Sequence, residues 1–434
     1  MADLLELSRR MIDEDPGPPE DPGERVDLGP ANRVTLELSE VDDGVAVVEA
    51  FSHVVAFDSG DGLVLFDTSL GPFGPGVVKA LRGWRTDPVH TLVYTHGHVD
   101  HVGGAGAFMT DAEERGGVRP SVVGHEAIGS RFDRYDLTNG YNAVINQRQF
   151  GGTGLTGGDA RGFPHDWVRP DVTYRDRLDL QIGSLDLQLH HSRGETDDHT
   201  WTWIPSRRTV CVGDLLIWVF PNAGNPQKVQ RYPLEWAQAL REIASLEPEL
   251  LLPAHGLPIG GRDRIQMVLD DVARALEGIV SDTLAMMNAG ATLDEIVHTV
   301  SVPADLLAKP YLRPTYDEPE FVVRNIWRMY GGWYDGNPAR LKPPSDSAIA
   351  RETAALVGGV GVLVDRALEL GELGDHRLAC HLIELAVQAD PDDLAAHRAR
   401  AELYTRRRAD EASLMSKGIY GWAARQSAER TGDT

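Results

Sequence analysis

The stretch THGHVDH, residues 95–101, decides how the rest of this chain folds and what it can bind. It holds three of the chain's 15 histidines and one aspartate, all between residues 96 and 101. Imidazole and carboxylate groups at the turn after a strand can converge on a cation, and this set suits zinc or another borderline divalent metal. We expect His96 and His98 to face one ion, and Asp100 and His101 to face a second.

Short apolar segments on both sides of this motif predict a layered α/β fold. Four segments are rich in Val, Leu and Phe and are each expected to form a strand: GVAVVEAF (44–51), HVVAFDS (53–59), GLVLFDT (62–68) and HTLVYT (90–95). PGVVKALRGW (75–84) has the pattern of a helix. Strands that alternate with helices indicate sheets covered by helical layers.

The second half of the chain continues this pattern and then becomes helical. Residues 126–170 are rich in Gly, and we expect them to form a long irregular segment. Strands are expected again from residue 172, followed by a helix at 233–246. After the Pro-rich break at 341–344, residues 345–434 have a helical pattern, within which residues 375–409 resemble one helix-turn-helix unit of a tetratricopeptide-like array.

The composition excludes several classes of protein. The 434 residues carry 42 Lys and Arg against 66 Asp and Glu, which gives a formal net charge of -24. Such a surface repels phosphate backbones, so we expect no nucleic-acid partner. No apolar run approaches the roughly 18–20 residues of a membrane span, and the N-terminus has no secretory pattern. Because there are only two cysteines, Cys211 and Cys380, we exclude a disulfide scaffold and expect a cytoplasmic location.

Four further features occur in the order that the metallo-β-lactamase superfamily follows. Asp67 ends an early strand, and Glu195 lies in the turn RGETDDHT. Asp214 follows 19 residues after Glu195 in a Gly-Asp pair, and His255 lies in the sequence PAHG. With the HxHxDH motif, the chain therefore resembles this superfamily over about residues 45–256. The resemblance implies an αββα sandwich and adds Glu195, Asp214 and His255 to the metal ligands.

One branch of the superfamily is similar in two more respects. The alkylsulfatases carry Glu where most members have His, as at Glu195, and WYDGNPA (333–339) resembles the opening of their dimerisation domain. The resemblance implies a homodimer and a helical C-terminal domain, with no sterol-carrier-like module in this chain. It also implies two zinc ions per subunit and cleavage of an alkyl sulfate ester by a metal-bound hydroxide, with Asp100 as a proton shuttle. His199 is the alternative to Glu195 as a ligand, and we expect it to support a ligand instead.

Two departures from the alkylsulfatase pattern leave the substrate open. Asp214 replaces that family's bridging Glu, and the arginine that holds sulfate is replaced by Lys228 or Arg231. Tyr141, Asn142 and Arg148 resemble a stretch near the family's sulfate pocket, although the spacing of the arginine differs. We predict that Tyr141, Asn142, Arg148, Lys228 and Arg231 bind the substrate. The alternative substrates are a carboxylic ester, a lactone, a thioester or a phosphodiester, and an iron-loaded non-hydrolytic enzyme is a third hypothesis.

These features divide the chain into three expected parts. Residues 1–30 form an N-terminal arm, because 13–30 is rich in Pro, Gly and acidic residues. Residues 31–300 form the metallo-β-lactamase-like catalytic domain, and residues 301–434 form the helical dimerisation domain.

Overall fold

The computed structural model describes residues 3–15, 32–151, 163 and 166–433, and the chain divides into two units. Among the described residues, the first unit holds 3–15, 32–139, 163 and 166–332, and the second holds 140–151 and 333–433. The N-terminal segment begins with helix α1 (Leu4–Glu14). The rest of the expected arm, from residue 16 onward, lies outside the described residues.

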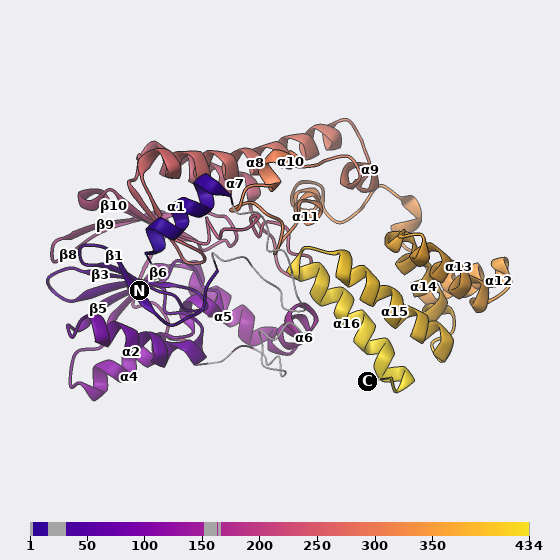
Figure 1. The fold of residues 1–434 in the computed structure, drawn as a ribbon, viewed down its shortest axis with the longest axis horizontal. Coiled ribbons are helices and arrows are strands. Elements are labelled where there is room, and N and C mark those ends of the chain that lie inside the picture. Colours follow the sequence, from indigo (N-terminus) through magenta and orange to yellow (C-terminus); the bar gives the residue numbers. More distant parts are fainter. Residues whose placement is uncertain (1–2, 16–31, 152–162, 164–165, 434) are drawn as a thin grey trace. The chain divides into compact units, whose positions relative to one another are not determined.

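Two sheets form the centre of the first unit (Figure 1). The first sheet follows the chain order β1 (Leu38–Asp42), β2 (Val45–Val48), β3 (Val54–Asp58), β4 (Leu63–Phe66), β5 (Val89–Val93), β6 (Ser121–His125) and β7 (Val172–Tyr174). The second has the order β13 (Ile259–Gly260), β12 (Leu250–Pro253), β11 (Thr209–Gly213), β10 (Thr200–Ile204), β9 (Leu185–His191) and β8 (Arg177–Ile182). The strands predicted between residues 44 and 95 are therefore confirmed.

Both faces of strands β2, β3 and β4 are buried, which is why these three strands are almost entirely apolar. On β3, Val55 and Phe57 join the core between the sheets, whereas Val54 and Ala56 join a second core under a helical layer. That layer consists of α2 (Gly74–Trp84), α4 (Ala105–Glu114) and α5 (Ala127–Leu137). Helices α7 (Pro233–Ser245) and α8 (Arg262–Asn288) pack against the second sheet. The arrangement is the predicted αββα sandwich.

The parallel strand pairs determine where the site lies. Strand β4 is parallel to β5, β5 is parallel to β6, and β11 is parallel to β12. In layered α/β folds, functional side chains gather beyond the carboxyl ends of such strands. Asp67 follows β4, the 95–101 motif follows β5, Asp214 follows β11 and His255 follows β12. Helix α3 (Val99–Val102) begins inside the motif.

The expectation of an irregular segment over 126–170 was wrong for residues 127–150, which form α5 and α6 (Asn139–Phe150). On α5, the buried side chains are Ile128, Arg131, Phe132 and Tyr135, which have helical spacing. An arginine within this stripe and the nearby Gly and Asn residues concealed the periodicity in the sequence. The first unit ends with α9 (Leu293–Val297), α10 (Ala304–Leu307) and α11 (Pro319–Gly331).

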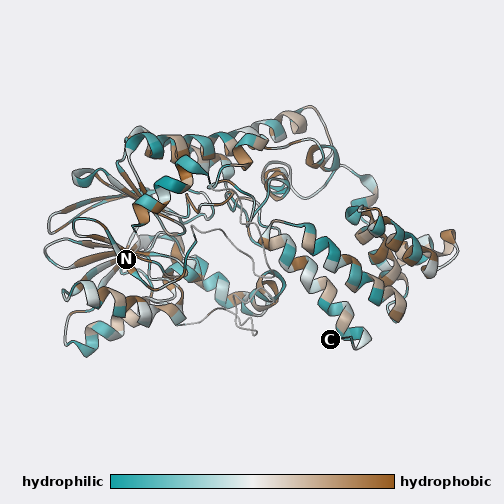
Figure 2. Cartoon of the chain, viewed as in Figure 1, coloured by the Kyte–Doolittle hydropathy of each residue, from teal (hydrophilic) through white to brown (hydrophobic). Residues whose placement is uncertain are grey.

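The second unit is helical, as predicted for residues 345–434. Its helices are the greater part of α6, α12 (Asp346–Val357), α13 (Val360–Glu372), α14 (His376–Ala389), α15 (Leu394–Asp410) and α16 (Leu414–Thr431). One apolar core contains residues from all five helices from α12 to α16. Hydrophobic residues gather in α13 and α14 of this unit and in the strands of the first unit (Figure 2). Arg425 donates a hydrogen bond to the carbonyl of Gly151 at 2.7 Å, just after α6. In the described part of the chain no single helix is long and apolar enough to cross a membrane, although α12 and α13 pass that test together across an 89° bend.

Candidate metal centre

Asp67 orients the metal-ligand motif through three hydrogen bonds. Its carboxylate accepts one from the Thr95 amide, one from the Thr95 hydroxyl and one from Nδ1 of His101, each at 2.7 Å. Asp67 has a φ of 61°, a backbone conformation that costs energy for a residue with a side chain. These bonds outweigh that cost. Because Nδ1 of His101 is occupied, its Nε2 is the nitrogen left to bind a metal.

The structure brings together all seven side chains predicted as metal ligands. They form two groups, and within each group the candidate ligand atoms all lie within 4.8 Å of one another: His96, His98, Glu195 and Asp214, and then Asp100, His101 and His255. Asp214 lies between the groups, because its Oδ2 is 3.8 Å from His96 Nε2 and 3.4 Å from His101 Nε2. The two groups divide these side chains in the way that the sequence predicts for His96 and His98 and for Asp100 and His101.

The protonation states and free lone pairs of this cluster suit a divalent cation. Burial lowers the pKa values of His96 and His98 well below the ordinary value, so both rings are neutral and can each offer a lone pair. Burial opposes ionisation of Asp214, yet His101 and His255 hold the pKa of its carboxyl far below the usual range. His101 Nε2 and Asp214 Oδ1 are buried without a hydrogen-bond partner among the described residues. Neutral imidazoles, an ionised carboxylate and inward-facing unpaired atoms are what a metal site requires.

His199 occupies the position expected of a supporting residue. It is fully buried, and its Nε2 lies 3.0 Å from the carbonyl oxygen of Val212, to which it donates a hydrogen bond. Its ring centroid is 5.2 Å from that of His96. Glu195, in contrast, has a carboxylate oxygen 3.7 Å from His98 Nδ1. The geometry thus supports Glu195 over His199 as the ligand from this turn.

A second buried carboxylate, on Asp198, holds the His96–His98 backbone. Its Oδ2 accepts hydrogen bonds from the Gly97 amide at 3.0 Å and from Nε of Arg131 at 2.8 Å. Any side chain at Gly97 would collide with both partners, because its Cβ would lie 2.9 Å from each. The sequence analysis missed Arg131 and Asp198. A pair of adjacent aspartates in the turn RGETDDHT was the available signal, but the buried arginine partner is remote in sequence.

Two polar side chains hold Glu195. Asn222 donates a hydrogen bond to Glu195 Oε1, and Arg231 donates one to the Glu195 carbonyl while its guanidinium lies 3.2 Å from Oε1. Arg231 is 2% exposed. Burial raises the pKa of Glu195, and Arg231 acts in the opposite direction. The structure therefore places Arg231, predicted to bind substrate, against a metal ligand.

Lys228 lies on the same loop and is close enough to the cluster to feel its charges. Burial lowers the pKa of its ammonium to about 8, with a further lowering from Arg231 and an opposing effect of Asp100 and Glu195. Its Nζ lies 5.9 Å from the ring centroid of Phe163. A partly buried cation that is influenced by two carboxylates is suited to receive an anionic group.

The other predicted substrate residues lie in the second unit. Tyr141, Asn142 and Arg148 are on α6, where Tyr141 is exposed and Asn142 is buried. Their role in binding substrate stays a prediction.

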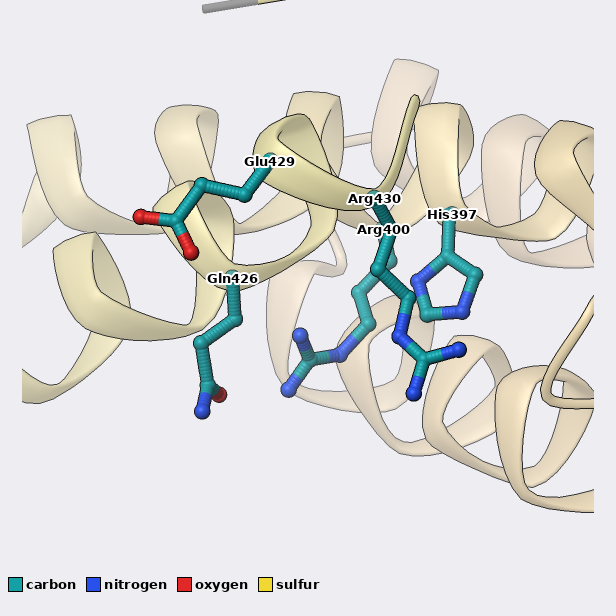
Figure 3. A pocket seen from close by; sticks show the side chains of 5 residues that line it. All are labelled: His397, Arg400, Gln426, Glu429 and Arg430. Carbon is teal, nitrogen blue, oxygen red and sulfur yellow. The ribbon is translucent and has the colours of Figure 1, made fainter. Parts of the chain in front are cut away.

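A pocket of about 470 Å³ in the second unit is lined by His397, Arg400, Gln426, Glu429 and Arg430 (Figure 3). Both ring nitrogens of His397 have partners, Ser427 Oγ and the Pro391 carbonyl, each at 3.0 Å. Arg400 bonds Glu384 at 2.6 Å and the Ala423 carbonyl at 2.7 Å. These groups connect helices α14, α15 and α16, and they do not form a cluster of metal ligands.

Comparisons with known proteins match two successive segments of the chain. Residues 47–255 match the metallo-beta-lactamase superfamily, and residues 292–430 match the alkyl sulfatase dimerisation family. A linear primary-alkylsulfatase from Pseudomonas sp. is 27% identical over 361 residues, covering 80% of this chain and 68% of that protein. An alkyl/aryl-sulfatase from Saccharomyces cerevisiae is 25% identical over 329 residues, covering 72% of this chain and 50% of that protein. The chain thus spans about half to two thirds of the length of these relatives.

A solved structure supports the fold. The stereoselective inverting sec-alkylsulfatase Pisa1 from Pseudomonas sp. superposes with a TM-score of 0.79 at 22% identity, covering 92% of this chain and 66% of that one. The predicted fold, an αββα sandwich followed by a helical C-terminal domain, is confirmed.

The bond between Asp198 and Gly97 generates a testable prediction. Asp198→Ala should weaken metal binding about 10- to 100-fold, the usual cost of losing a hydrogen-bond partner that orients a ligand. Arg131 keeps its ion pair with Asp197 in this variant, so no buried charge is left unpaired. Metal content after dialysis against a graded chelator measures the effect. Asp197→Asn, which alters an exposed partner of the same arginine, is the control, and equal metal retention in both variants would contradict the role of Asp198.

Proposed function

Because the chain joins a metallo-beta-lactamase domain to an alkyl sulfatase dimerisation domain, we propose that it is a metal-dependent hydrolase that cleaves alkyl sulfate esters. The observation that carries the proposal is the convergence of seven candidate ligand side chains near the partly buried ammonium of Lys228. In a chain with a net charge of -24, this is a site where an anionic ester can be attracted. The relatives described as alkylsulfatases support the choice of a sulfate ester.

Two zinc ions are the cofactors proposed for this cluster. His96, His98 and Glu195 would hold one ion, Asp100, His101 and His255 the other, and Asp214 would lie between them. Bound zinc supplies Lewis acidity and lowers the pKa of a coordinated water towards about 7. Asp100 stays ionised and can accept a hydrogen bond from such a water: burial raises the pKa of its carboxyl, but His101 and His255 hold that pKa below the usual value. Its Oδ2 lies 3.3 Å from His255 Nε2.

Release of inorganic sulfate from a medium-chain alkyl sulfate tests the reaction. The zinc-loaded protein should release sulfate, and a chelator should stop it. His98→Ala and Asp214→Ala should each lower kcat/KM by more than the about 100-fold expected for losing a supporting hydrogen bond. His90→Ala, which removes an exposed histidine at the start of the same strand region, is the matched control.

A negative result in the sulfate-release test would separate the choice of substrate from the metal-dependent mechanism. If the metal-replete protein releases no sulfate but hydrolyses a carboxylic ester, lactone, thioester or phosphodiester, the metal-dependent hydrolase stands and the sulfate ester is wrong. Turnover retained in both His98→Ala and Asp214→Ala would contradict the metal-dependent mechanism itself.

We assign Lys228 to the sulfate group of the substrate. Its pKa of about 8 means that the ammonium loses its charge above that pH, so KM should stay level up to about pH 7 and rise through pH 9. Lys228→Met should raise KM about 10- to 100-fold, since a hydrogen bond to a charged group contributes about 1.5–3 kcal/mol. Lys228→Arg should remove the alkaline rise, because guanidinium stays charged. A KM profile of Lys228→Arg identical to the wild type would contradict this assignment.

The homodimer is proposed to form through the second unit. Helix α12 exposes Ile349, Leu356 and Val357, and α13 exposes Val362. A group of exposed apolar side chains on adjacent helices is typical of a surface that another protein covers. These residues also lie within the alkyl sulfatase dimerisation match.

Leu356→Asp should therefore convert a dimer into monomers of 47.5 kDa, because it places a charge on the apolar surface. Sedimentation velocity measures the mass. Leu137→Asp is the control, since Leu137 is 84% exposed in the first unit and Leu356 is 79% exposed in the second. A dimer that persists in Leu356→Asp would show that this surface is not the interface.

A further inference from the structure

The loop that carries Lys228 is held by a carboxylate from a much later part of the chain. Asp317 is fully buried, and its Oδ2 accepts hydrogen bonds from the amides of Gly224 at 2.6 Å and Asn225 at 3.1 Å. Its Oδ1 accepts a third from the Glu318 amide at 2.8 Å. A buried carboxylate is costly unless such bonds satisfy it, so this arrangement fixes the loop backbone firmly.

A second anchor lies on helix α11. Asn325 Oδ1 accepts hydrogen bonds from Gln230 Nε2 at 2.9 Å and from the Arg231 amide at 3.3 Å. The Asn325 side-chain amide donates to the Arg231 carbonyl at 3.0 Å. Both backbone polar groups of Arg231 are thus held by one side chain, while its guanidinium holds Glu195.

The two anchors bracket Lys228. Asp317 fixes residues 224 and 225, and Asn325 fixes residues 230 and 231. Between them, the Asn225 carbonyl accepts the Lys228 amide at 3.3 Å. The loop also lies directly against α11, because a Cβ at Gly224 would be 2.4 Å from the backbone of Phe321 and Val322.

We propose that Asp317 and Asn325 are positioning residues, which set the place of Lys228 and Arg231 and so determine how tightly the site holds an anionic substrate. The inference rests on the proposed function of Lys228 as the anion-binding group. It goes beyond that function because it assigns a role in the catalytic unit to the start of the segment that matches the dimerisation family, residues 292–430. Asp317 and Asn325 both lie in the first unit.

The charge of Asp317 supports a dedicated role. Burial raises the pKa of its carboxyl to about 7, while the amides of Gly224, Glu318 and Asn225 lower it. An asparagine could not replace it without loss, because an amide nitrogen facing Gly224 and Asn225, or facing Glu318, would meet another donor. The bonds of the Asp317 side chain do not serve to cap helix α11, because no side chain in the described part of the chain caps the N-terminus of that helix.

The experiment compares Asp317→Asn and Asn325→Ala with Asp271→Asn in the full-length, metal-loaded protein. Asp271 is a matched control, because it is buried in the same unit and accepts a hydrogen bond from the Tyr311 hydroxyl at 2.7 Å. Hydrogen–deuterium exchange of a peptide covering 221–232 should become faster in the first two variants only. At full metal occupancy, verified for each variant, KM for an alkyl sulfate should rise about tenfold in the first two variants, with kcat within about threefold.

The outcomes separate this inference from the proposed function. Unchanged exchange of 221–232 in both Asp317→Asn and Asn325→Ala would overturn it, as would an equal rise of KM in Asp271→Asn. The exchange measurement needs no substrate, so it still tests the anchors if the protein cleaves another ester. Asn325→Asp, which keeps the acceptor for Gln230 and the Arg231 amide but turns an oxygen towards the Arg231 carbonyl, should also exchange faster than the wild type over 221–232. If Asp317→Asn does not fold, the two Asn325 variants carry the same comparison.

Discussion

The mutual repulsion of three clustered carboxylates, on the buried Glu195 and Asp214 and the partly buried Asp100, is the constraint on which the rest of the site depends. They lie in two adjoining groups of ligand atoms in the interior of an acidic protein. Burying charges of one sign is unfavourable unless cations or hydrogen-bond donors compensate them. Arg231 meets Glu195, and His101 and His255 meet Asp214. Because His96 and His98 are neutral, they do not compensate the negative charge of the carboxylates. A pair of divalent ions would provide the missing positive charge.

A supporting residue from elsewhere in the chain fixes each ligand segment. Asp67 orients His101, Asp198 holds the backbone between His96 and His98, and Asn222 holds Glu195. Such partners set the direction of the donor atoms before any ligand arrives, so less ordering is required on binding. The parallel strands bring these segments to one edge of the sandwich, but the strands alone would leave the loops free to move. Buried side-chain bonds to backbone amides supply the remaining restraint.

The ligands could be predicted from the sequence because their spacing is local or follows a known order. His96, His98, Asp100 and His101 adjoin one another, and their placement follows from a single strand and turn. Apart from Asp67 and His199, the supporting residues could not be found this way. Asp317 and its loop are more than ninety residues apart, so only the folded chain shows that they meet. Helix α5 was missed for a related reason, since Arg131 has a partner only in the tertiary structure.

The boundary between the two units of the structure does not coincide with the domain boundary predicted from the sequence, nor with the start of the dimerisation match. The contacts divide the chain after residue 332, and the dimerisation match begins at residue 292. The boundary predicted at residue 300 lies between them. Helix α11 stays with the catalytic unit because its Asn325 and the preceding Asp317 bond the Lys228 loop. Residues that follow it, from 333 onward, have their own core.

The choice of lysine as the proposed anion-binding group affects which esters the site can distinguish. An ammonium is a point charge, whereas a guanidinium recognises the paired oxygens of an oxyanion through a planar fork. Arg231 has such a fork, but it is directed at Glu195. Geometry therefore gives little discrimination between tetrahedral oxyanions, and net charge becomes the discriminating property. A sulfate monoester carries one negative charge, while a phosphate monoester approaches two at neutral pH. The second charge would face the carboxylates of Asp100, Glu195 and Asp214, so the same constraint that shapes the cluster favours the monoanionic ester.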